Sequence, residues 1–309
     1  MSHQILLFYK YIDIQDTLLE RLIQTKKCKE LGLTGRMIIA TEGLNATFEG
    51  AVEGIKLYCD WLLLRPGFED IHLKFSQGTG LSFPKLSIKE RPEIVSAHLG
   101  REDLDPREIT GKYLTASELH KWIHSDKEFY IVDMRNDYEH SVGHFAGSIL
   151  SKFENFRDLG KILPELEHLK DKTVVTVCTG GVRCEKASGF LVKQGFKEVY
   201  QLFGGIVTYM EQYPNQDFKG KLYVFDQRIT MGFNATAPEH EVIAKCQKCL
   251  EKSERFVNCS FSGCNKHFIC CENCAESSGN SYCTTECKYS DFYEPFRHHF
   301  RIGLLGKRV

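Results

Sequence analysis

The sequence lacks three features, each of which would point to a particular class of protein. Its 309 residues contain 40 Lys and Arg against 41 Asp and Glu, so the net charge of −1 provides no overall field for nucleic acid or membrane. No apolar segment approaches the ~20 residues that a membrane-spanning helix needs. The N-terminal MSHQILLFYKYID has neither a basic leader nor a small-residue cleavage site, so we expect no signal peptide. These absences favour a cytoplasmic protein with no membrane association, in which any site for a polyanion is a local patch.

The sequence also lacks a glycine-rich nucleotide-binding motif, internal repeats and low-complexity tracts. We therefore predict neither a nucleotide cofactor nor a repeat architecture. The hydrophobic fraction of 42% is ordinary for a globular protein, and the length suits about two to three domains. We expect a multidomain α/β protein.

Residues 1–100 have the pattern of a ferredoxin-like α+β sandwich. Apolar alternation predicts strands and a hairpin with its turn near Glu42 and Gly43, and helical periodicity predicts two helices. The predicted elements are a strand at 5–12, a helix at 16–33, a hairpin at 35–50, a helix at 52–67 and a strand at 71–77. Their order, βαββαβ, places two helices on one face of an antiparallel sheet.

Residues 115–215 alternate helices and strands in the manner of a parallel α/β domain, after a polar linker at 101–114. The predicted elements are a helix at 115–124, a strand at 128–135, a strand at 173–177, a helix at 184–195 and a strand at 199–205. Residues 216–309 form a small cysteine-rich region with a basic tail.

A cysteine with a glycine pair follows the predicted strand at 173–177. In VTVCTGGVRCEKASG, Cys178 lies at the carboxyl end of that strand, where open α/β sheets place reactive groups. Inward backbone N–H groups, the start of the following helix and Arg183 all favour an anion at this sulfur. We predict a nucleophilic Cys178, with Arg183 stabilising the anion. The predicted active-site loop consists of Thr179, Gly180, Gly181 and Val182.

Cys184 is a second thiol in the first turn of the following helix. Three roles stay open for it: accepting sulfur from Cys178, forming a regulatory disulfide with it, or filling the place of a helix-capping hydroxyl residue. Cys28 and Cys59 lie in apolar helical patterns and are expected to be buried hydrophobes.

The central segments VDMRNDYEHSVGHFAGSI, CTGGVRC and LFGGI resemble a rhodanese domain. The resemblance implies that Cys178 carries a persulfide and that Asp133, Arg135 and His144 are structural. Four residues separate Cys178 from Arg183, as in the sulfur-handling loop of this family rather than the longer loop of the related thiol phosphatases.

Four further motifs narrow this resemblance. CTGGVRCEKAS, GRMIIATEGLNATFEG, FPKLSIKERPEIV and GKLYVFDQRI resemble, together and across essentially the whole chain, the tRNA uridine(34) hydroxylases. Leu44 and Ala46 depart from the usual Ile and Gly of that family's N-terminal motif. The resemblance implies an oxidoreductase that uses molecular oxygen to hydroxylate the wobble uridine of tRNA at C5, with the anticodon loop as its partner.

Two other functions stay open on the residues alone: a sulfurtransferase that uses a Cys178 persulfide, and a non-catalytic RNA-binding scaffold. The sequence contains no evident oxygen-activating centre. His124 and Asp126 have the H-x-D spacing of an iron site, but without an evident third ligand we interpret them as a solvated turn. A thiolate or persulfide at Cys178 could instead attack C6 of uracil and make C5 electron-rich toward oxygen.

Nine of the thirteen cysteines lie between Cys246 and Cys287. Pairs of cysteines two to four residues apart are typical of tetrahedral zinc sites, and a reducing compartment favours metal over disulfides. We predict two structural zinc ions in an interleaved, cross-brace arrangement, with sequential pairing, an iron–sulfur cluster, or substitution by Cys270 or His267 as alternatives. The predicted ligands are Cys246, Cys249, Cys271 and Cys274 for one ion, and Cys259, Cys264, Cys283 and Cys287 for the other.

The C-terminal FRHHFRIGLLGKRV combines basic and aromatic residues, which suits phosphate contact with base stacking. A solvated terminal helix is the alternative interpretation. The predicted RNA contacts are Arg297, Arg301, Lys307 and Arg308. Three basic residues on predicted N-terminal strands could add to a groove that binds RNA. They are Lys10, Arg36 and Lys74.

Overall fold

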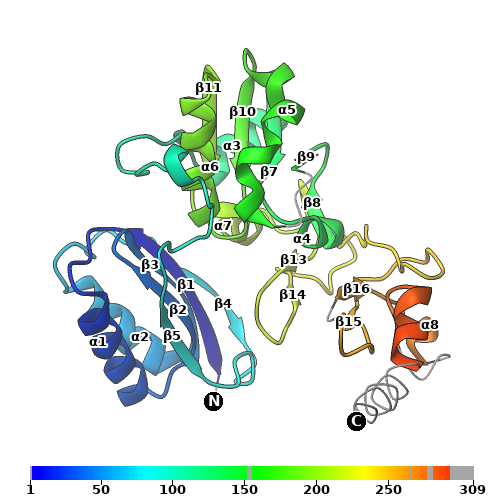
Figure 1. The fold of residues 1–309 in the computed structure, drawn as a ribbon, viewed down its shortest axis with the longest axis horizontal. Helices are drawn as coiled ribbons and strands as arrows, with labels where there is room; N and C mark the ends of the chain where they lie inside the picture. Colours follow the sequence, from blue (N-terminus) through cyan, green and yellow to red (C-terminus); the bar gives the residue numbers. More distant parts are fainter. Residues whose placement is uncertain (1, 152–154, 265, 277–280, 293–309) are drawn as a thin grey trace, which may run out of the picture.

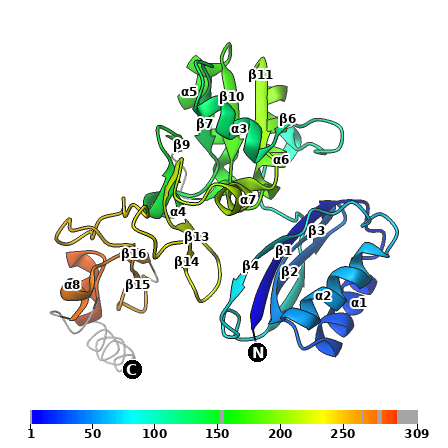
Figure 2. The ribbon, with the colours of Figure 1, turned by 180° about the vertical axis from the view of Figure 1, so that it is seen from behind.

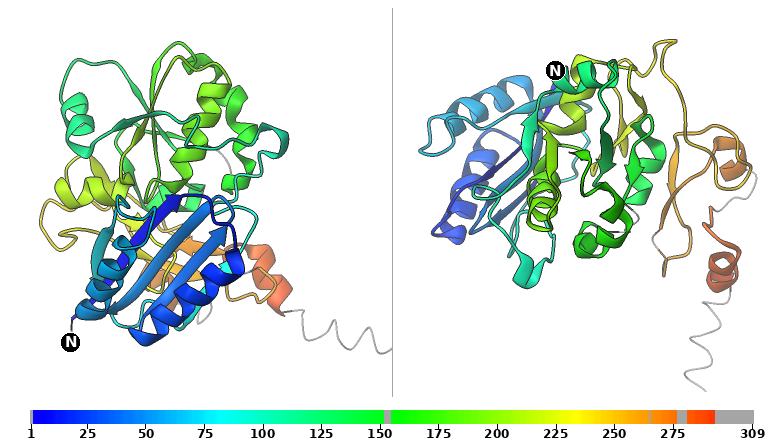
Figure 3. Two further views of the ribbon diagram at one scale, coloured as in Figure 1. Left: turned by 90° about the vertical axis from the view of Figure 1, so that its left-hand side faces the viewer. Right: turned by 90° about the horizontal axis from the view of Figure 1, so that it is seen from above.

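The computed structural model describes residues 2–151, 155–264, 266–276 and 281–292. Three parts follow one another along the chain, and the central domain lies between the N-terminal domain and the cysteine-rich part (Figure 1; Figure 3, right). This is the multidomain α/β architecture that the sequence predicts. None of the described helices is long and apolar enough to cross a membrane.

The N-terminal domain is a five-stranded sheet covered on one face by two helices (Figures 1 and 2). The strand order is β4-β1-β3-β2-β5. Its elements are β1 (His3–Tyr11), α1 (Thr17–Glu30), β2 (Thr34–Ala40), β3 (Gly43–Ala51), α2 (Val52–Leu63), β4 (Lys74–Gly78) and β5 (Leu86–Glu90). Successive side chains of a strand point to opposite faces, so Leu6 and Phe8 enter the core under the helices, while Leu7 and Tyr9 face away from it.

The structure contains a strand, β5, that the predicted βαββαβ order did not include. It pairs parallel to β2, from Gly35 opposite Leu86 to Ile39 opposite Glu90. The segment has weak apolar alternation because it forms the sheet edge, where a strand needs less burial. It extends the antiparallel sandwich by one parallel edge strand.

The central domain contains a parallel five-stranded sheet of order β6-β11-β10-β7-β9. The strands of this sheet are β6 (Lys112–Leu114), β7 (Tyr130–Asp133), β9 (Ile149–Leu150), β10 (Thr173–Val177) and β11 (Glu198–Leu202), and β8 (Gly143–Phe145) lies outside it. The helices are α3 (Ala116–Ile123), α4 (Asp137–Val142), α5 (Leu163–Leu166), α6 (Val182–Lys193) and α7 (Gly205–Gln212), with short 3-10 turns η1 (Gly100–Glu102), η2 (Phe156–Ile162) and η3 (Glu167–Leu169). Thr115 caps α3 in a capping box with Glu118, as its sequence predicts.

Two short strands lie at the predicted domain limits. β6 falls inside the segment 101–114 that we expected to be a linker, and it extends the central sheet beside β11. β12 (Phe218–Gly220) follows residue 215 and pairs with β8. Strands of three residues give little periodic signal, so the limits at residues 100, 114 and 215 stay predictions.

The cysteine-rich part has little regular structure. Its elements are β13 (Leu222–Tyr223), β14 (Thr230–Met231), β15 (Phe256–Asn258), β16 (His267–Ile269) and α8 (Glu272–Glu276), and residues 285–292 are also helical. It packs on the central domain through a small apolar cluster in which Val142 of α4 lies with Tyr223, Phe256 and Ile269.

Candidate active site

The thiol of Cys178 lies directly after β10, at the start of a tight loop. Gly181 adopts a left-handed conformation with φ of 103° and serves as the N-cap of α6. A side chain at this angle would be strained, so glycine is required here. The backbone N–H of Gly181 donates to the Cys178 sulfur at 3.2 Å. The loop therefore points backbone donors at the sulfur, as its sequence predicts.

The pKa of Cys178 lies below that of an ordinary thiol, although the side chain is fully buried. Burial alone would raise this pKa. The thiol of Cys184, the charge of Arg183, and the backbone N–H groups of Cys184 and Gly181 together outweigh burial and lower it. The loop thus favours a reactive thiolate.

Cys184 is buried beside Cys178, and both thiols are free. Its S–H group hydrogen-bonds to the Cys178 sulfur, and burial raises its own pKa well above the usual value. Cys184 therefore acts in this structure as a neutral donor to the neighbouring thiolate. This contact is compatible with sulfur transfer or disulfide formation between the two.

Arg183 is held by a carboxylate that the sequence did not single out. Its guanidinium donates to both oxygens of Glu139, at 2.6 and 2.8 Å, and the Glu139 side chain is fully buried. Glu139 also accepts from the backbone N–H of Asn136 as the acidic member of a capping box. The N-x-x-E spacing before α4 was the signal that could have found it. The charge of Arg183 is thus balanced within the protein.

The N-terminal sheet covers the thiol loop. A Cβ atom on Gly180 would lie 2.8 Å from Leu7, and one on Gly181 would lie 2.8 Å from the Tyr9 hydroxyl. That hydroxyl donates to Glu185 of α6 at 2.8 Å. The glycine pair therefore serves a second purpose, because a side chain at either position would have to displace Leu7 or Tyr9 of the neighbouring domain.

A buried lysine of α6 ties the same domains together. Lys186 pairs with Glu42 at 2.9 Å, with Asp103 at 3.2 Å and with Glu93 at 3.7 Å. Its side chain is fully buried, and such a cation persists only where carboxylates compensate it. The network fixes the helix that carries Cys184 against the N-terminal domain.

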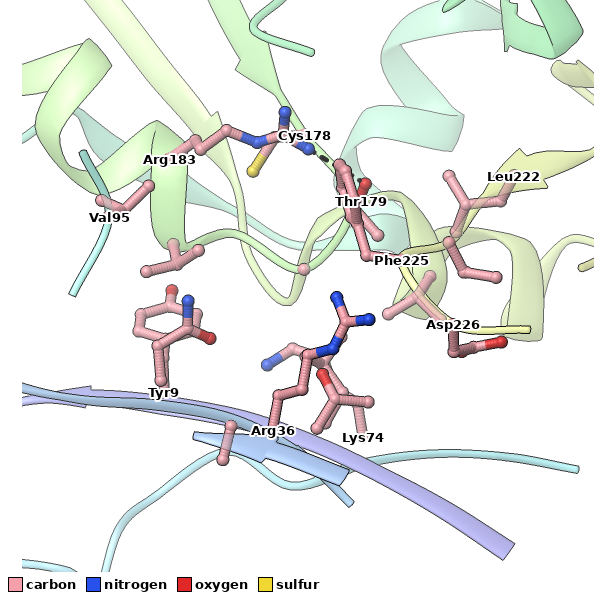
Figure 4. Close-up of a pocket in the computed structure, with 18 of the residues that line it drawn as sticks. Tyr9, Arg36, Lys74, Val95, Cys178, Thr179, Arg183, Leu222, Phe225 and Asp226 are labelled. Carbon is pink, nitrogen blue, oxygen red and sulfur yellow. Dashed lines mark hydrogen bonds between the residues drawn. The ribbon is translucent and has the colours of Figure 1, made fainter. Parts of the chain in front are cut away.

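Between the two domains lies a cavity of about 510 Å³, with Cys178 in its wall (Figure 4). This volume is within the range of sites for small ligands and could hold a nucleotide. In Figure 4, Tyr9, Arg36 and Lys74 rise from the N-terminal sheet toward the loop with Cys178 and Thr179. The wall also contains Phe225 and Asp226 from the segment between β13 and β14. All three parts of the chain thus contribute to the wall of one site.

The predicted RNA contacts have different places. Arg36 and Lys74 line the cavity, whereas Lys10 pairs with Asp70 at 2.6 Å on the surface. The tail contacts, Arg297, Arg301, Lys307 and Arg308, lie outside the described residues.

The structural residues of the central domain have the predicted roles. Arg135 is fully buried and binds both oxygens of Asp133, with distances from 2.6 to 3.1 Å, and it donates to the carbonyl of Gly143 at 2.7 Å. His144 hydrogen-bonds to the carbonyl of His140 at 2.9 Å and stacks on its ring. These contacts fix the segment that presents Glu139.

His124 lies with partners other than Asp126. It belongs to a group with His120 and Asp217, in which Asp217 contacts His120 at 2.8 Å and His124 at 3.0 Å. The Tyr209 hydroxyl also donates to Asp217. These mutual hydrogen bonds already satisfy the carboxylate, and they join α3 to the segment between α7 and β12.

Eight cysteines form two groups of four, here named the first and second cysteine sites. The first consists of Cys246, Cys249, Cys271 and Cys274, and the second of Cys259, Cys264, Cys283 and Cys287. Neighbouring sulfurs are 3.5 to 3.6 Å apart where hydrogen-bonded, close to the ~3.8 Å edge of a tetrahedron with Zn–S bonds of ~2.3 Å. The sets are interleaved along the chain. Of the suggested substitutes, Cys270 stays outside both groups, and His267 hydrogen-bonds to Tyr223.

Three family models match the chain in succession. They are the UPF0176 acylphosphatase like domain over residues 3–94, the Rhodanese-like domain over residues 115–212, and the Rhodanase C-terminal model over residues 219–288. The first two correspond to the sandwich and the parallel domain described above.

Relatives match over nearly the full length. A protein of Cytophaga hutchinsonii is 42% identical, and the alignment covers 96% of this chain and 93% of the relative. A protein of Bacillus licheniformis is 40% identical over 93% of this chain and 88% of the relative, and one of Staphylococcus carnosus is 40% identical over 91% and 92%. All three are named tRNA uridine(34) hydroxylase.

Solved rhodanese-like domains resemble the chain only weakly. One from Anabaena is 18% identical with a TM-score of 0.31, covering 36% of this chain and 80% of that domain. One from Staphylococcus aureus is 27% identical with a TM-score of 0.28, covering 32% of this chain and 90% of that domain. The family of this chain therefore follows from the relatives that match nearly its full length.

Proposed function

The chain belongs to the tRNA uridine(34) hydroxylase family, and from this premise we propose that it hydroxylates the wobble uridine of tRNA at C5, with molecular oxygen as co-substrate. The observation that carries the proposal is the identity of about 40% across all three parts of the chain, which together build the cavity at Cys178. A tRNA substrate also favours a cytoplasmic location.

The cavity suits a base that has left its stack. Enzymes that modify a base generally extrude it into a pocket, and bases in the loop of a tRNA are readily splayed out. Tyr9, Phe225 and other aromatic side chains line the cavity and supply apolar surface for a ring. Arg36 at its wall supplies positive charge for the phosphate backbone.

We assign the first chemical step to the thiolate of Cys178. Its sulfur adds to C6 of uracil, the π pair of the C5–C6 bond moves through C4 to O4, and C5 becomes electron-rich. Cys184 supports this step because its S–H group stabilises the thiolate before attack. Substrate tRNA that carries 5-fluorouridine at position 34 should trap the adduct at Cys178, and a persistent lack of adduct would argue against this step.

We further propose that the two cysteine sites each hold a structural zinc ion. The sulfur spacing and the all-thiolate ligand sets support zinc. The ions would bind between segments that have little core of their own, and metal binding would stabilise their fold.

Mass spectrometry of tRNA nucleosides tests the main proposal. Cells that lack their own enzyme should gain 5-hydroxyuridine derivatives when they express this chain, and growth under ¹⁸O₂ should raise the nucleoside mass by about 2 Da through one oxygen atom. The variant Cys178→Ala should abolish the product. No change in tRNA nucleosides with the wild-type chain would refute the function.

A sulfurtransferase is the second candidate, because the same loop would also hold a Cys178 persulfide: its backbone N–H groups and the Cys184 thiol stabilise an anion. In the nucleoside experiment, loss or gain of thiolated bases rather than hydroxylated ones would favour this function. If neither class changes, a non-catalytic RNA-binding role is the remaining interpretation.

A further inference from the structure

Lys74 is a buried cation that faces the thiol loop from the other domain. It lies opposite Leu7 in the antiparallel pair of β1 and β4. Directly opposed residues project to the same face of a sheet, and Leu7 packs against Gly180 of the thiol loop. The Lys74 ammonium lies 5.0 Å from the ring centre of Tyr9, the side chain that meets Gly181. The register of the sheet thus places Lys74 in the wall of the cavity that contains Cys178.

Among the residues that the structure describes, this lysine has no carboxylate as counterion. Its exposed fraction is 4%. Within the described ranges, the ammonium reaches the carbonyl oxygen of His72 at 3.4 Å but forms no ion pair with a carboxylate. Buried charges are generally paired, as Lys186 is with its three carboxylates. An unpaired buried lysine is therefore costly, and its place in a reactive cavity indicates a function.

The nearest negative charges to Lys74 belong to the site. The attraction to the Cys178 thiolate and to Glu185 raises its pKa, but burial is the larger effect and lowers the pKa to about 8. Glu185 is itself surrounded by donors from Tyr9, Tyr113 and Gln201. The thiolate is also attracted by Arg183, but Glu139 already balances the charge of that guanidinium. Lys74 is therefore the cation in the cavity wall whose charge the thiolate can compensate.

We propose that Lys74 of the N-terminal domain is a catalytic residue of this site, and that its ammonium is the counterion of the reacting anion at Cys178. In the free enzyme this anion is the thiolate. Stabilisation of the anion is then shared: Arg183 lowers the Cys178 pKa by its charge and contacts Glu139, and Lys74 adds a second cation from the N-terminal domain.

The same cation also suits the substrate, and this part rests on the proposed function. When the sulfur bonds to C6 of a uracil, the displaced π pair places the negative charge on O4. The charge passes from sulfur to oxygen without leaving the cavity, so one ammonium can stabilise both states. The site would therefore select a pyrimidine with a carbonyl oxygen at C4, and the exocyclic amine of cytosine would not receive this stabilisation.

Alkylation of Cys178 tests the counterion without requiring tRNA. The rate of reaction with iodoacetamide is measured on the full chain from pH 5 to 10, with the Cys178 peptide quantified by mass spectrometry. Loss of a neighbouring opposite charge generally shifts a pKa by about one unit, so K74M should react about tenfold more slowly at a pH below the wild-type midpoint. The alkylation rates of the two proteins should converge at high pH, where Cys178 is ionised in both wild type and K74M.

Two matched variants separate charge from shape. K74R retains the cation and should restore most of the rate, whereas K89M removes an exposed cation of the same sheet and should follow the wild type. Circular dichroism checks folding, and K74Q replaces K74M if the latter does not fold. Overlap of the K74M and wild-type profiles, or an equal shift in K89M, would overturn the proposal.

The nucleoside assay then distinguishes this inference from the proposed function. If wild-type chain produces no hydroxyuridine, the function fails while the alkylation profiles still decide the role of Lys74. If the wild-type chain is active, K74M should form at least about tenfold less hydroxyuridine. Full activity of K74M with an unshifted alkylation profile would refute the role of Lys74 and leave the proposed function intact.

Discussion

The buried pair of Glu139 and Arg183 gives the sharpest prediction about stability. The change is Glu139→Gln, which keeps the size of the side chain and one carbonyl oxygen but removes the charge. In the wild type, both carboxylate oxygens accept from Arg183 within 2.8 Å, and the two side chains are 0% and 9% exposed. The variant leaves the guanidinium charged, buried and without its counterion.

The expected cost follows from the asymmetry of buried ion pairs. Removal of one partner generally costs about 3–5 kcal/mol, whereas replacement of both by neutral groups is often nearly neutral. We expect about 3 kcal/mol for E139Q, because glutamine keeps one hydrogen bond. The double variant E139Q/R183M should be more stable than the sum of the single changes predicts, with a coupling energy of about 2 kcal/mol.

The two tryptophans of the chain make the measurement specific. Trp61 lies in α2 and Trp122 in α3, so a Trp61→Phe background leaves one fluorescent reporter in the central domain. Urea unfolding of the four proteins in this background gives the double-mutant cycle. An E139Q cost within about 0.5 kcal/mol of zero, or strict additivity in the double variant, would refute the idea that Glu139 neutralises Arg183.

Four further outcomes follow from the site and the cysteine sites. K74M should raise the free energy of unfolding at pH 7 by about 3 kcal/mol, since burial lowers the Lys74 pKa from 10.5 to about 8 and each unit is worth ~1.4 kcal/mol. The folded wild type loses this proton near pH 8, while the unfolded chain keeps it to about pH 10.5. The wild type therefore becomes more stable as the pH rises between these values, and the stability advantage of K74M shrinks. A K74M variant that is less stable than wild type at pH 7 would contradict this. C184A should raise the pKa of Cys178 and slow its alkylation at neutral pH, and C184S, which keeps a donor, should restore the rate; equal profiles for wild type and C184A would exclude the hydrogen bond. G181A should displace the loop, because its Cβ would meet the Tyr9 hydroxyl and its φ is 103°, and alkylation at wild-type rate would show that the loop tolerates the change. Metal analysis of the purified chain should find two zinc ions, falling to about one in C249A, and an unchanged content in that variant would contradict the assignment of the first cysteine site.

Local sequence patterns were sufficient for much of the fold and for the thiol loop. Alternation along β1, the capping box at Thr115 and the strand, glycine pair and helix around Cys178 are all set by residues close together in the chain. The cysteine pairs are likewise local, but their spacing left sequential and interleaved pairing open, and the fold brings them together in the interleaved arrangement that we favoured. Short elements such as β5, β6 and β12 lacked enough periodicity to be recognised, because pairing at a sheet edge depends on the neighbouring strand.

The sequence alone also determined the family, since the motifs around Cys178 occur with N-terminal and C-terminal motifs in one order. Tertiary structure alone decided which groups surround the sulfur. Glu139 is 44 residues from Arg183, and Tyr9 is 176 residues from Glu185, while Lys74 reaches the cavity only because the register of β1 and β4 places it opposite Leu7. Charge balance and burial at a site depend on packing between distant segments, and no spacing within the thiol loop reports them.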